Sequence, residues 1–245
     1  MHHFFVEPSD VGDSLISIKG QDVNHIRNVL RMKIGEEILI SDGTGKDYVC
    51  EVAELSDDIV TAKITDFLAE GRELKTELYL FQGLPKSDKM ELIIQKAVEL
   101  GVKAIIPVST SRSIVKLDGK KEESKIKRWQ AISESAAKQS KRGIIPEVKS
   151  IMSFKEAINY VNDFDVKIIP YENANNMAET KQIVSSIKEK MKVAIFIGPE
   201  GGFADSEIDY ALEKDVKPIS LGKRILRTET AGMTILSVIM FNIEE

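Results

Sequence analysis

Short apolar runs alternate with amphipathic stretches from residue 78 to the C-terminal end of the chain. Runs such as AIIPVST (104–110) and VAIFIG (193–198) have the length and unbroken apolar character of strands that are buried on both faces. Between the runs, apolar residues recur every three or four positions, which is the period of a helix with one buried face. Strand–helix alternation of this kind predicts an α/β fold with a parallel sheet that is covered by helices on both faces.

The same patterns place the individual elements of this region. Strands are expected at 78–84, 104–110, 166–172, 193–198 and 218–222. Helices are expected at 87–101, 120–142, 153–163, 180–191, 205–215 and 228–243. Asp88 and Glu91 have the spacing of a capping box at the start of the first helix, and Thr228 is expected to cap the last one.

The first 70 residues have a different pattern, in which apolar and polar residues alternate over short segments. This alternation predicts half-buried strands at 4–6, 14–18, 36–42, 47–55 and 59–67. A short helix between the second and third strands is expected to be capped by Asp22 or Asn24. The polar stretch 69–77 is a plausible linker. We therefore expect a small N-terminal β-barrel over residues 1–70 and an α/β domain over residues 74–245.

The composition excludes several classes of protein and of site. No stretch approaches the roughly 20 apolar residues of a membrane span. The N-terminal residues lack the basic flank and apolar core of a secretory signal, which favours the cytoplasm. The single cysteine excludes an internal disulfide, and with only three histidines besides it a metal site is not expected.

The net charge of −5 is distributed unevenly along the chain. Residues 112–149 carry 11 Lys and Arg against 5 Asp and Glu, which gives a local net charge of +6. Such a basic segment fits contact with nucleic-acid phosphates. It fits equally well the solvated surface of a lysine-rich helix, so charge alone leaves both interpretations open.

Three loops that follow expected strands are rich in residues that leave the backbone accessible: 169–173 (IPYEN), 197–203 (IGPEGGF) and 221–231 (LGKRILRTETA). Parallel sheets bind ligands at the carboxyl ends of their strands. In the second loop, Gly201 and Gly202 let the backbone approach a ligand closely because they have no Cβ. A GxGxxG fingerprint and a Walker A motif are both absent. Taken singly, the second loop fits a tight turn, and the third an exposed loop before a helix, better than either fits a ligand site.

In combination, these loops and the helix that runs to the C-terminal end resemble the SPOUT superfamily of S-adenosylmethionine-dependent RNA methyltransferases. Within that superfamily they look like the RsmE-type enzymes, which methylate ribosomal RNA. Further segments that look like this family are MHHFFV (1–6), HIRNVLRMKIGEEI (25–38), QKAVELGV (95–102) and KRWQAISESAAKQSKRGIIPEV (127–148). The resemblance therefore extends along the whole chain.

The resemblance implies both a fold and an activity. The N-terminal barrel would be a PUA-like domain that helps to hold RNA. The C-terminal domain would be a SPOUT-type α/β trefoil knot, through which the chain forms a homodimer. The reaction would transfer a methyl group from S-adenosyl-L-methionine to N3 of a specific uridine in 16S ribosomal RNA of the small ribosomal subunit, with no metal and no membrane involved.

The resemblance also implies roles for individual residues. Backbone groups and apolar side chains of the three loops would hold the cofactor: Pro170, Tyr171, Ile197, Gly198, Glu200, Gly201, Gly202, Leu221, Gly222, Ile225, Leu226 and Thr230. Arg112, Arg227 and Glu229 are the catalytic candidates, because an arginine stabilises a developing oxyanion and a carboxylate accepts a proton or orients the arginine. Ordinary ion pairs or phosphate contacts are the alternative role for both arginines. The candidates for RNA phosphate contacts are Arg27, Arg31, Lys138, Lys141 and Arg142.

Two functions of other classes remain open at the level of the sequence. An RNA-binding module without catalysis would bind no S-adenosylmethionine. A nucleotide-dependent transferase that uses the same loops would be stabilised by ATP instead. The glycine pair and the intact RTET stretch at residues 227–230 favour the methyltransferase.

Overall fold

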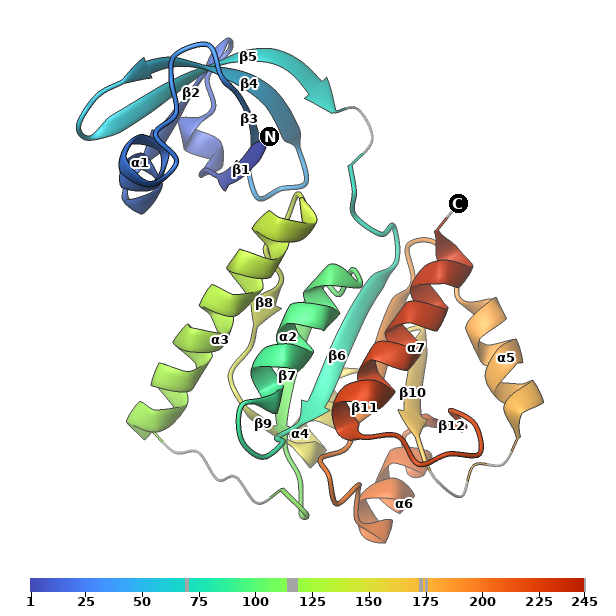
Figure 1. Cartoon of the computed structure of the whole chain (residues 1–245). Coiled ribbons are helices and arrows are strands. Elements are labelled where there is room, and N and C mark those ends of the chain that lie inside the picture. Colours follow the sequence, from blue (N-terminus) through green and yellow to red (C-terminus); the bar gives the residue numbers. More distant parts are fainter. Residues whose placement is uncertain (69–70, 114–118, 172–173, 175, 245) are drawn as a thin grey trace. The chain divides into compact units, whose positions relative to one another are not determined.

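The computed structural model describes residues 1–68, 71–113, 119–171, 174 and 176–244. The chain forms two compact units, which Figure 1 shows coloured along the sequence. The first comprises Met1–Glu73 and Ala137–Ile145, and the second comprises Leu74–Ala136 and Pro146–Glu245. A segment distant in sequence, residues 137–145, thus completes the N-terminal unit.

The first unit contains a five-stranded sheet in the order β1-β3-β4-β5-β2. Only β1 and β3 pair in parallel, and the other neighbours are antiparallel. The strands are β1 (His2–Phe5), β2 (Leu15–Lys19), β3 (Glu37–Ser41), β4 (Asp47–Leu55) and β5 (Ile59–Leu68). Two register shifts between β4 and β5, at Val49/Cys50 and Val52/Glu54, bend these long strands. Strand alternation therefore predicted the β-rich unit correctly.

The short helix of the first unit differs from its expected form. The helical segments are α1 (Gln21–Asn24), a π-helical turn that continues it (His25–Val29) and a 3-10 turn (Pro8–Asp10). Gly20 occupies the cap position of α1, so capping by Asp22 or Asn24 is wrong. The Asp22 carboxylate instead accepts from Lys138 Nζ at 3.3 Å, and Asn24 Oδ1 accepts from Asn28 at 2.7 Å.

The second unit contains a seven-stranded sheet in the order β12-β10-β11-β6-β7-β8, with β9 also paired to β7. Every pairing is parallel, which confirms the α/β prediction. The strands are β6 (Glu77–Gly83), β7 (Ala104–Ser109), β8 (Glu147–Val148), β9 (Met152–Ser153), β10 (Val166–Pro170), β11 (Lys192–Ile197) and β12 (Lys217–Ile219). β8 and β9 were not expected, because two residues are too few for a periodic pattern.

Helices cover both faces of this sheet. They are α2 (Lys89–Glu99), α3 (Gly119–Ser140), α4 (Phe154–Tyr160), α5 (Met177–Ser186), α6 (Asp205–Glu213) and α7 (Thr228–Ile243). On one face, Phe81 and Phe196 of the sheet pack in one core with Phe154 of α4 and Ile208 of α6. α7 lies over the other face and packs against α2 (Figure 1). The trefoil knot that the resemblance implies stays a prediction.

Some details of the second unit correct the expected elements. Asp88 precedes α2 but makes no capping bond, so the capping box is wrong; Glu91 instead pairs with Arg128 at 2.8 Å. The helix expected at 180–191 is α5, which begins earlier because Asn176 Oδ1 caps it. Residues 69 and 70 of the expected linker, 114–118 of the basic segment and 172–173 of the first loop lie outside the described residues.

None of the described helices is both long enough and apolar enough to cross a membrane. The described residues contain no cluster of three or more His, Cys, Asp or Glu that could hold a metal ion.

Candidate cofactor and catalytic site

The three loops of interest follow neighbouring strands. β10 lies between β12 and β11 in the sheet, so the carboxyl ends of the three strands meet at one edge. Pro170 is in register with Ile219, and the Tyr171 amide donates to the Ile219 carbonyl oxygen at 3.1 Å. Parallel sheets bind ligands at such an edge. The structure therefore brings together the segments that carry the expected cofactor-binding residues.

β6 supplies a fourth wall to this edge, because it pairs with β11 on the side away from β10. A Cβ on Gly83, the last residue of β6, would lie 2.6 Å from Pro199 Cδ, so only glycine allows this close approach. Within the loop after β11, Gly202 has a φ of +65° and donates its amide to the Pro199 carbonyl oxygen at 2.9 Å. The two glycines thus serve different purposes: one allows contact between loops and the other allows a left-handed turn.

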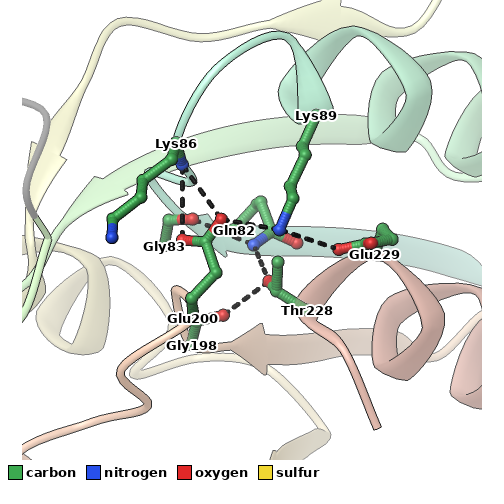
Figure 2. A network of polar contacts seen from close by, with 8 residues as sticks. All are labelled: Gln82, Gly83, Lys86, Lys89, Gly198, Glu200, Thr228 and Glu229. Atoms are coloured by element: carbon green, nitrogen blue, oxygen red, sulfur yellow. Dashed lines mark hydrogen bonds and ion pairs between the residues drawn. The ribbon is translucent and has the colours of Figure 1, made fainter.

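Thr228 joins β6, the loop after β11 and α7 through one hydroxyl (Figure 2). Its Oγ1 donates to the Gly198 carbonyl oxygen at 2.6 Å and accepts from Gln82 Nε2 at 2.9 Å. Gln82 Nε2 also donates to the Gly83 carbonyl oxygen at 2.9 Å, and the Gln82 side chain is fully buried. The prediction that Thr228 caps the last helix is wrong: Thr228 is the first residue of α7, and Arg227 occupies the cap position. The Thr228 hydroxyl binds Gly198 and Gln82 instead.

Lys89, at the start of α2, lies between two carboxylates (Figure 2). Its Nζ lies 2.8 Å from Glu200 Oε1 and 3.7 Å from Glu229 Oε2. The backbone amide of Lys86 also donates to Glu200, at 3.2 Å. Glu229 Oε2 is buried and has no hydrogen-bond partner among the described residues. The network thus connects the second loop, the first turn of α7 and the segment after β6.

The charges of this network shift one another's pKa values. Burial acts to raise the pKa of Glu200, but hydrogen bonds from Lys89 and from the Lys86 amide outweigh it, so the pKa lies below its usual value. The hydrogen bond to Glu200 raises the pKa of Lys89. Glu200 is therefore a stable carboxylate and Lys89 a stable ammonium at neutral pH, which suits a fixed ion pair better than a proton carrier.

Arg112 lies beside the second loop. One terminal nitrogen of its guanidinium donates to the Gly201 carbonyl oxygen at 3.0 Å, and the side chain is otherwise exposed. The preceding residue anchors the Arg112 loop, since the amide of Ser111 donates to Glu207 Oε1 at 2.8 Å. Glu207 is itself buried in the first turn of α6 and also accepts from the Ala204 amide. The structure thus places the Arg112 guanidinium against a residue expected to bind the cofactor.

The third loop presents apolar and cationic groups before α7. Ile225 is 90% exposed, whereas Leu221 and Leu226 are half-buried. Arg227 is exposed immediately before α7. Gly222 and Thr230 are exposed as well. By contrast, Ile197 is buried in the sheet, so it offers a ligand its backbone only.

The five residues expected to contact RNA belong to the first unit and differ in their surroundings. Arg142 is 4% exposed, and its guanidinium binds the Glu73 carboxylate, which also accepts from the Gly143 amide at 3.0 Å. This geometry favours a structural role for Arg142. Arg27 lies 2.8 Å from Asp57.

The remaining three differ in exposure. Lys138 is half-buried and binds the Asp22 carboxylate. Arg31 and Lys141 are exposed, and both have positive φ angles, of 55° and 58°. Because they are exposed, their side chains are the more accessible cations of the group.

Sequence reasoning missed Gln82, Gly83, Lys86 and Lys89. A signal was present, since Gln82 and Gly83 lie at the end of the strand expected at 78–84 and residues 85–89 follow it directly. The sequence did not show that this strand lies beside β11, so the fourth loop was not associated with the other three.

A cavity of ≈ 590 Å³ lies beside the Arg112 loop and not at the three loops. Seven of its ten lining residues carry a hydroxyl group: the lining consists of Ser109, Thr110, Ser111, Ser113, Ser153, Phe154, Lys155, Ser206, Glu207 and Tyr210. Several of these groups already bind one another, as Thr110 Oγ1 and Ser113 Oγ do at 2.9 Å. We therefore assign the candidate site from the converging loops rather than from this cavity.

Comparison with protein families gives two matches. Residues 72–240 match the RNA methyltransferase domain family, and residues 18–65 match the RNA methyltransferase PUA domain. Over 231 residues the chain is 41% identical to ribosomal RNA small subunit methyltransferase E of Bacillus subtilis, which covers 93% of this chain and 90% of the relative. The protein of the same name from Mesomycoplasma hyopneumoniae is 32% identical over 237 residues, or 97% and 98% of the two chains.

Solved structures agree with these relatives. Ribosomal RNA small subunit methyltransferase E from Neisseria gonorrhoeae, bound to S-adenosyl methionine, superposes with a TM-score of 0.87 at 30% identity, over 99% of this chain and 98% of the other. A putative methyltransferase from Legionella pneumophila, also in complex with S-adenosyl methionine, gives a TM-score of 0.83 at 31% identity, over 97% and 96% of the chains.

Proposed function

The chain belongs to the ribosomal RNA small subunit methyltransferase E family, and on this premise we propose that it methylates N3 of a specific uridine in 16S ribosomal RNA with S-adenosylmethionine as the methyl donor. The proposal is supported above all by 41% identity to a relative of that name over nearly the whole chain. The convergence of the three loops at one edge of the parallel sheet also supports it.

The chemistry of the loops fits the cofactor. Glu229 Oε2 is buried, Lys89 Nζ lies 3.7 Å from it, and it has no hydrogen-bond donor among the described residues, so it can still accept a hydrogen bond from a ligand. Ile225, Leu221 and Leu226 present apolar surface to an adenine ring, and the glycine-rich loop after β11 leaves backbone groups accessible. When bound, S-adenosylmethionine supplies the methyl group from its sulfonium centre. We propose that the cofactor-binding residues expected from the sequence in these three loops hold it.

In the reaction, side chains of the protein assist proton removal from the uracil and stabilise the negative charge that develops on it. N3 carries a proton that must leave before or during the attack. Arg112 and Arg227 remain protonated at any working pH, so they stabilise negative charge on a uracil carbonyl oxygen rather than accept the proton. Glu229 accepts the proton or orients Arg227. The contact of Arg112 with the Gly201 carbonyl oxygen supports this assignment, because it holds the guanidinium at the cofactor loop.

We propose further that the chain acts as a homodimer through its C-terminal domain. Exposed apolar side chains on the packed helices α2 and α7 support this: Leu92 is 43% exposed, Val238 48% and Phe241 85%. The expected trefoil knot belongs to the same domain, residues 74–245. Light scattering with size-exclusion chromatography tests the dimer, and Phe241→Glu should shift the mass to that of a monomer.

The N-terminal domain, residues 1–70, is proposed to hold RNA within the small ribosomal subunit in the cytoplasm. Arg31 and Lys141 are the best candidates for phosphate contacts, since both are exposed cations of the first unit. Arg27 and Lys138 have carboxylate partners with which phosphates would compete.

Nucleoside mass spectrometry tests the function directly. Ribosomal RNA from a strain that lacks this gene should contain no 3-methyluridine at the target, and expression of the chain should restore it. An unchanged 3-methyluridine content on deletion would refute the assignment. Calorimetric binding of S-adenosylmethionine separates an enzyme from an RNA-binding module that has lost catalysis.

A further inference from the structure

Lys89 is the first residue of α2, yet its side chain contacts two other elements (Figure 2). Its ammonium lies 2.8 Å from Glu200 Oε1 in the loop after β11, and 3.7 Å from Glu229 Oε2 in the first turn of α7. Residues 200 and 229 therefore present their carboxylates to one cation, although they are far apart in the sequence.

The position of Lys89 does not favour the helix that carries it. A cation in the first turn of a helix opposes the macrodipole, which prefers negative charge there. The side chain is only 30% exposed, so its placement also costs rotamer freedom. The benefit must lie in its partners, and these belong to the second and third loops.

We propose that Lys89 is a positioning residue, which holds the loop after β11 against the first turn of α7 in the arrangement that binds S-adenosylmethionine. This inference rests on the proposed function of those loops. Lys89 acts through the two carboxylates and needs no contact with the cofactor or with RNA.

The two carboxylates depend on the ammonium to different degrees. Glu200 also accepts from the Lys86 amide, at 3.2 Å. Glu229 Oε2 has no hydrogen bond from any described residue, so Lys89 is its nearest counter-charge in the network. Arg227, immediately before α7, is a further charged group that acts on Lys89. Without the ammonium, two anions would face each other across the boundary between the loops, and their repulsion would separate the loops.

The direct test is the affinity of Lys89→Met for S-adenosylmethionine, measured by calorimetry on the full-length protein at pH 8. We expect binding about tenfold weaker than in the wild type, from the loss of a charged hydrogen bond and the added repulsion. Turnover at saturating cofactor should fall less than the affinity does. Lys96→Met is the matched control, because Lys96 lies in the same helix and pairs with Glu99 at 2.8 Å; its affinity should equal that of the wild type.

A double variant distinguishes positioning from direct contact with the cofactor. Glu200→Gln removes one of the two anions but keeps the backbone groups through which residue 200 is expected to hold the cofactor, so adding it to Lys89→Met should restore part of the affinity. Lys89→Arg keeps the positive charge and should bind S-adenosylmethionine nearly as tightly as the wild type does. This variant still tests the inference if Lys89→Met fails to fold.

The outcomes separate the inference from its premise. If the wild type does not bind S-adenosylmethionine, the proposed function itself fails. If the wild type binds and Lys89→Met binds equally well, Lys89 does not position the loops. A defect that Glu200→Gln does not relieve would also overturn the inference, because it would mean that Lys89 contacts the cofactor directly.

Discussion

Replacing Thr228 by valine removes one hydroxyl and leaves the shape of the side chain nearly unchanged. Thr228 is 6% exposed, and its hydroxyl makes two hydrogen bonds, to the Gly198 carbonyl oxygen at 2.6 Å and from Gln82 Nε2 at 2.9 Å. Each bond contributes roughly 1 kcal/mol net. Gln82 is fully buried, and its Oε1 already has no hydrogen-bond partner among the described residues, so its amide is poorly placed to replace a lost bond with one to water. We expect the free energy of unfolding to fall by about 2 kcal/mol, and Tm by about 4–8 °C for a chain of this size.

Thermal unfolding followed by tryptophan fluorescence measures this change in the second unit. The chain has a single tryptophan, Trp129, which is 4% exposed and belongs to that unit. Thr234→Val is the matched control, since it makes the same change in α7 but removes only a bond to the Thr230 carbonyl oxygen within the helix, at 2.7 Å. The double variant Gln82→Leu/Thr228→Val should be less destabilised than the two single changes predict, because both partners become apolar. Equal losses in Thr228→Val and Thr234→Val would refute the role of Thr228 as a junction.

Three other substitutions test separate parts of the account. Gly83→Ala should destabilise the second unit by about 1–3 kcal/mol and weaken S-adenosylmethionine binding, because the new Cβ would lie 2.6 Å from Pro199 Cδ. Wild-type stability in denaturation and wild-type affinity in calorimetry would contradict the close packing of these loops. Arg227→Ala should lower turnover by roughly a hundredfold with a smaller change in cofactor affinity, and the reverse pattern would show that Arg227 binds the cofactor instead. Burial lowers the pKa of His3 to about 4, so the unfolded state binds more protons than the folded state between pH 6.5 and 4. The first unit should therefore lose up to about 3 kcal/mol of stability as the pH falls through this range. Asp47 offsets part of this loss, because burial raises its pKa. His3→Gln should flatten that part of the stability–pH curve measured by circular dichroism, and an unaltered curve would assign the acid sensitivity to other groups.

Apolar periodicity predicted those helices and strands whose bounds are set by the burial of an apolar face. The last helix was expected at 228–243 and has those bounds, because the sheet and α2 cover its apolar face. Side-chain hydrogen bonds decided the details that the sequence left open. Asn176 moves the start of α5, and Thr228 binds Gly198 instead of capping α7. Such choices depend on which partners lie within reach in the folded chain, and local sequence does not contain that information.

The composition of the candidate site depends on which strands are neighbours. β6 and β11 are separated by more than one hundred residues, yet they pair residue by residue from Glu77 opposite Lys192 to Gln82 opposite Ile197. This pairing is what places Gly83 against Pro199 and the Lys86 amide against Glu200. In the sequence, Gly83 is an unremarkable residue at the end of a strand, and Lys89 is one of many surface-type lysines. Their importance follows from strand order, which the alternation of strands and helices leaves open, so the fourth wall of the site becomes visible only in the folded protein.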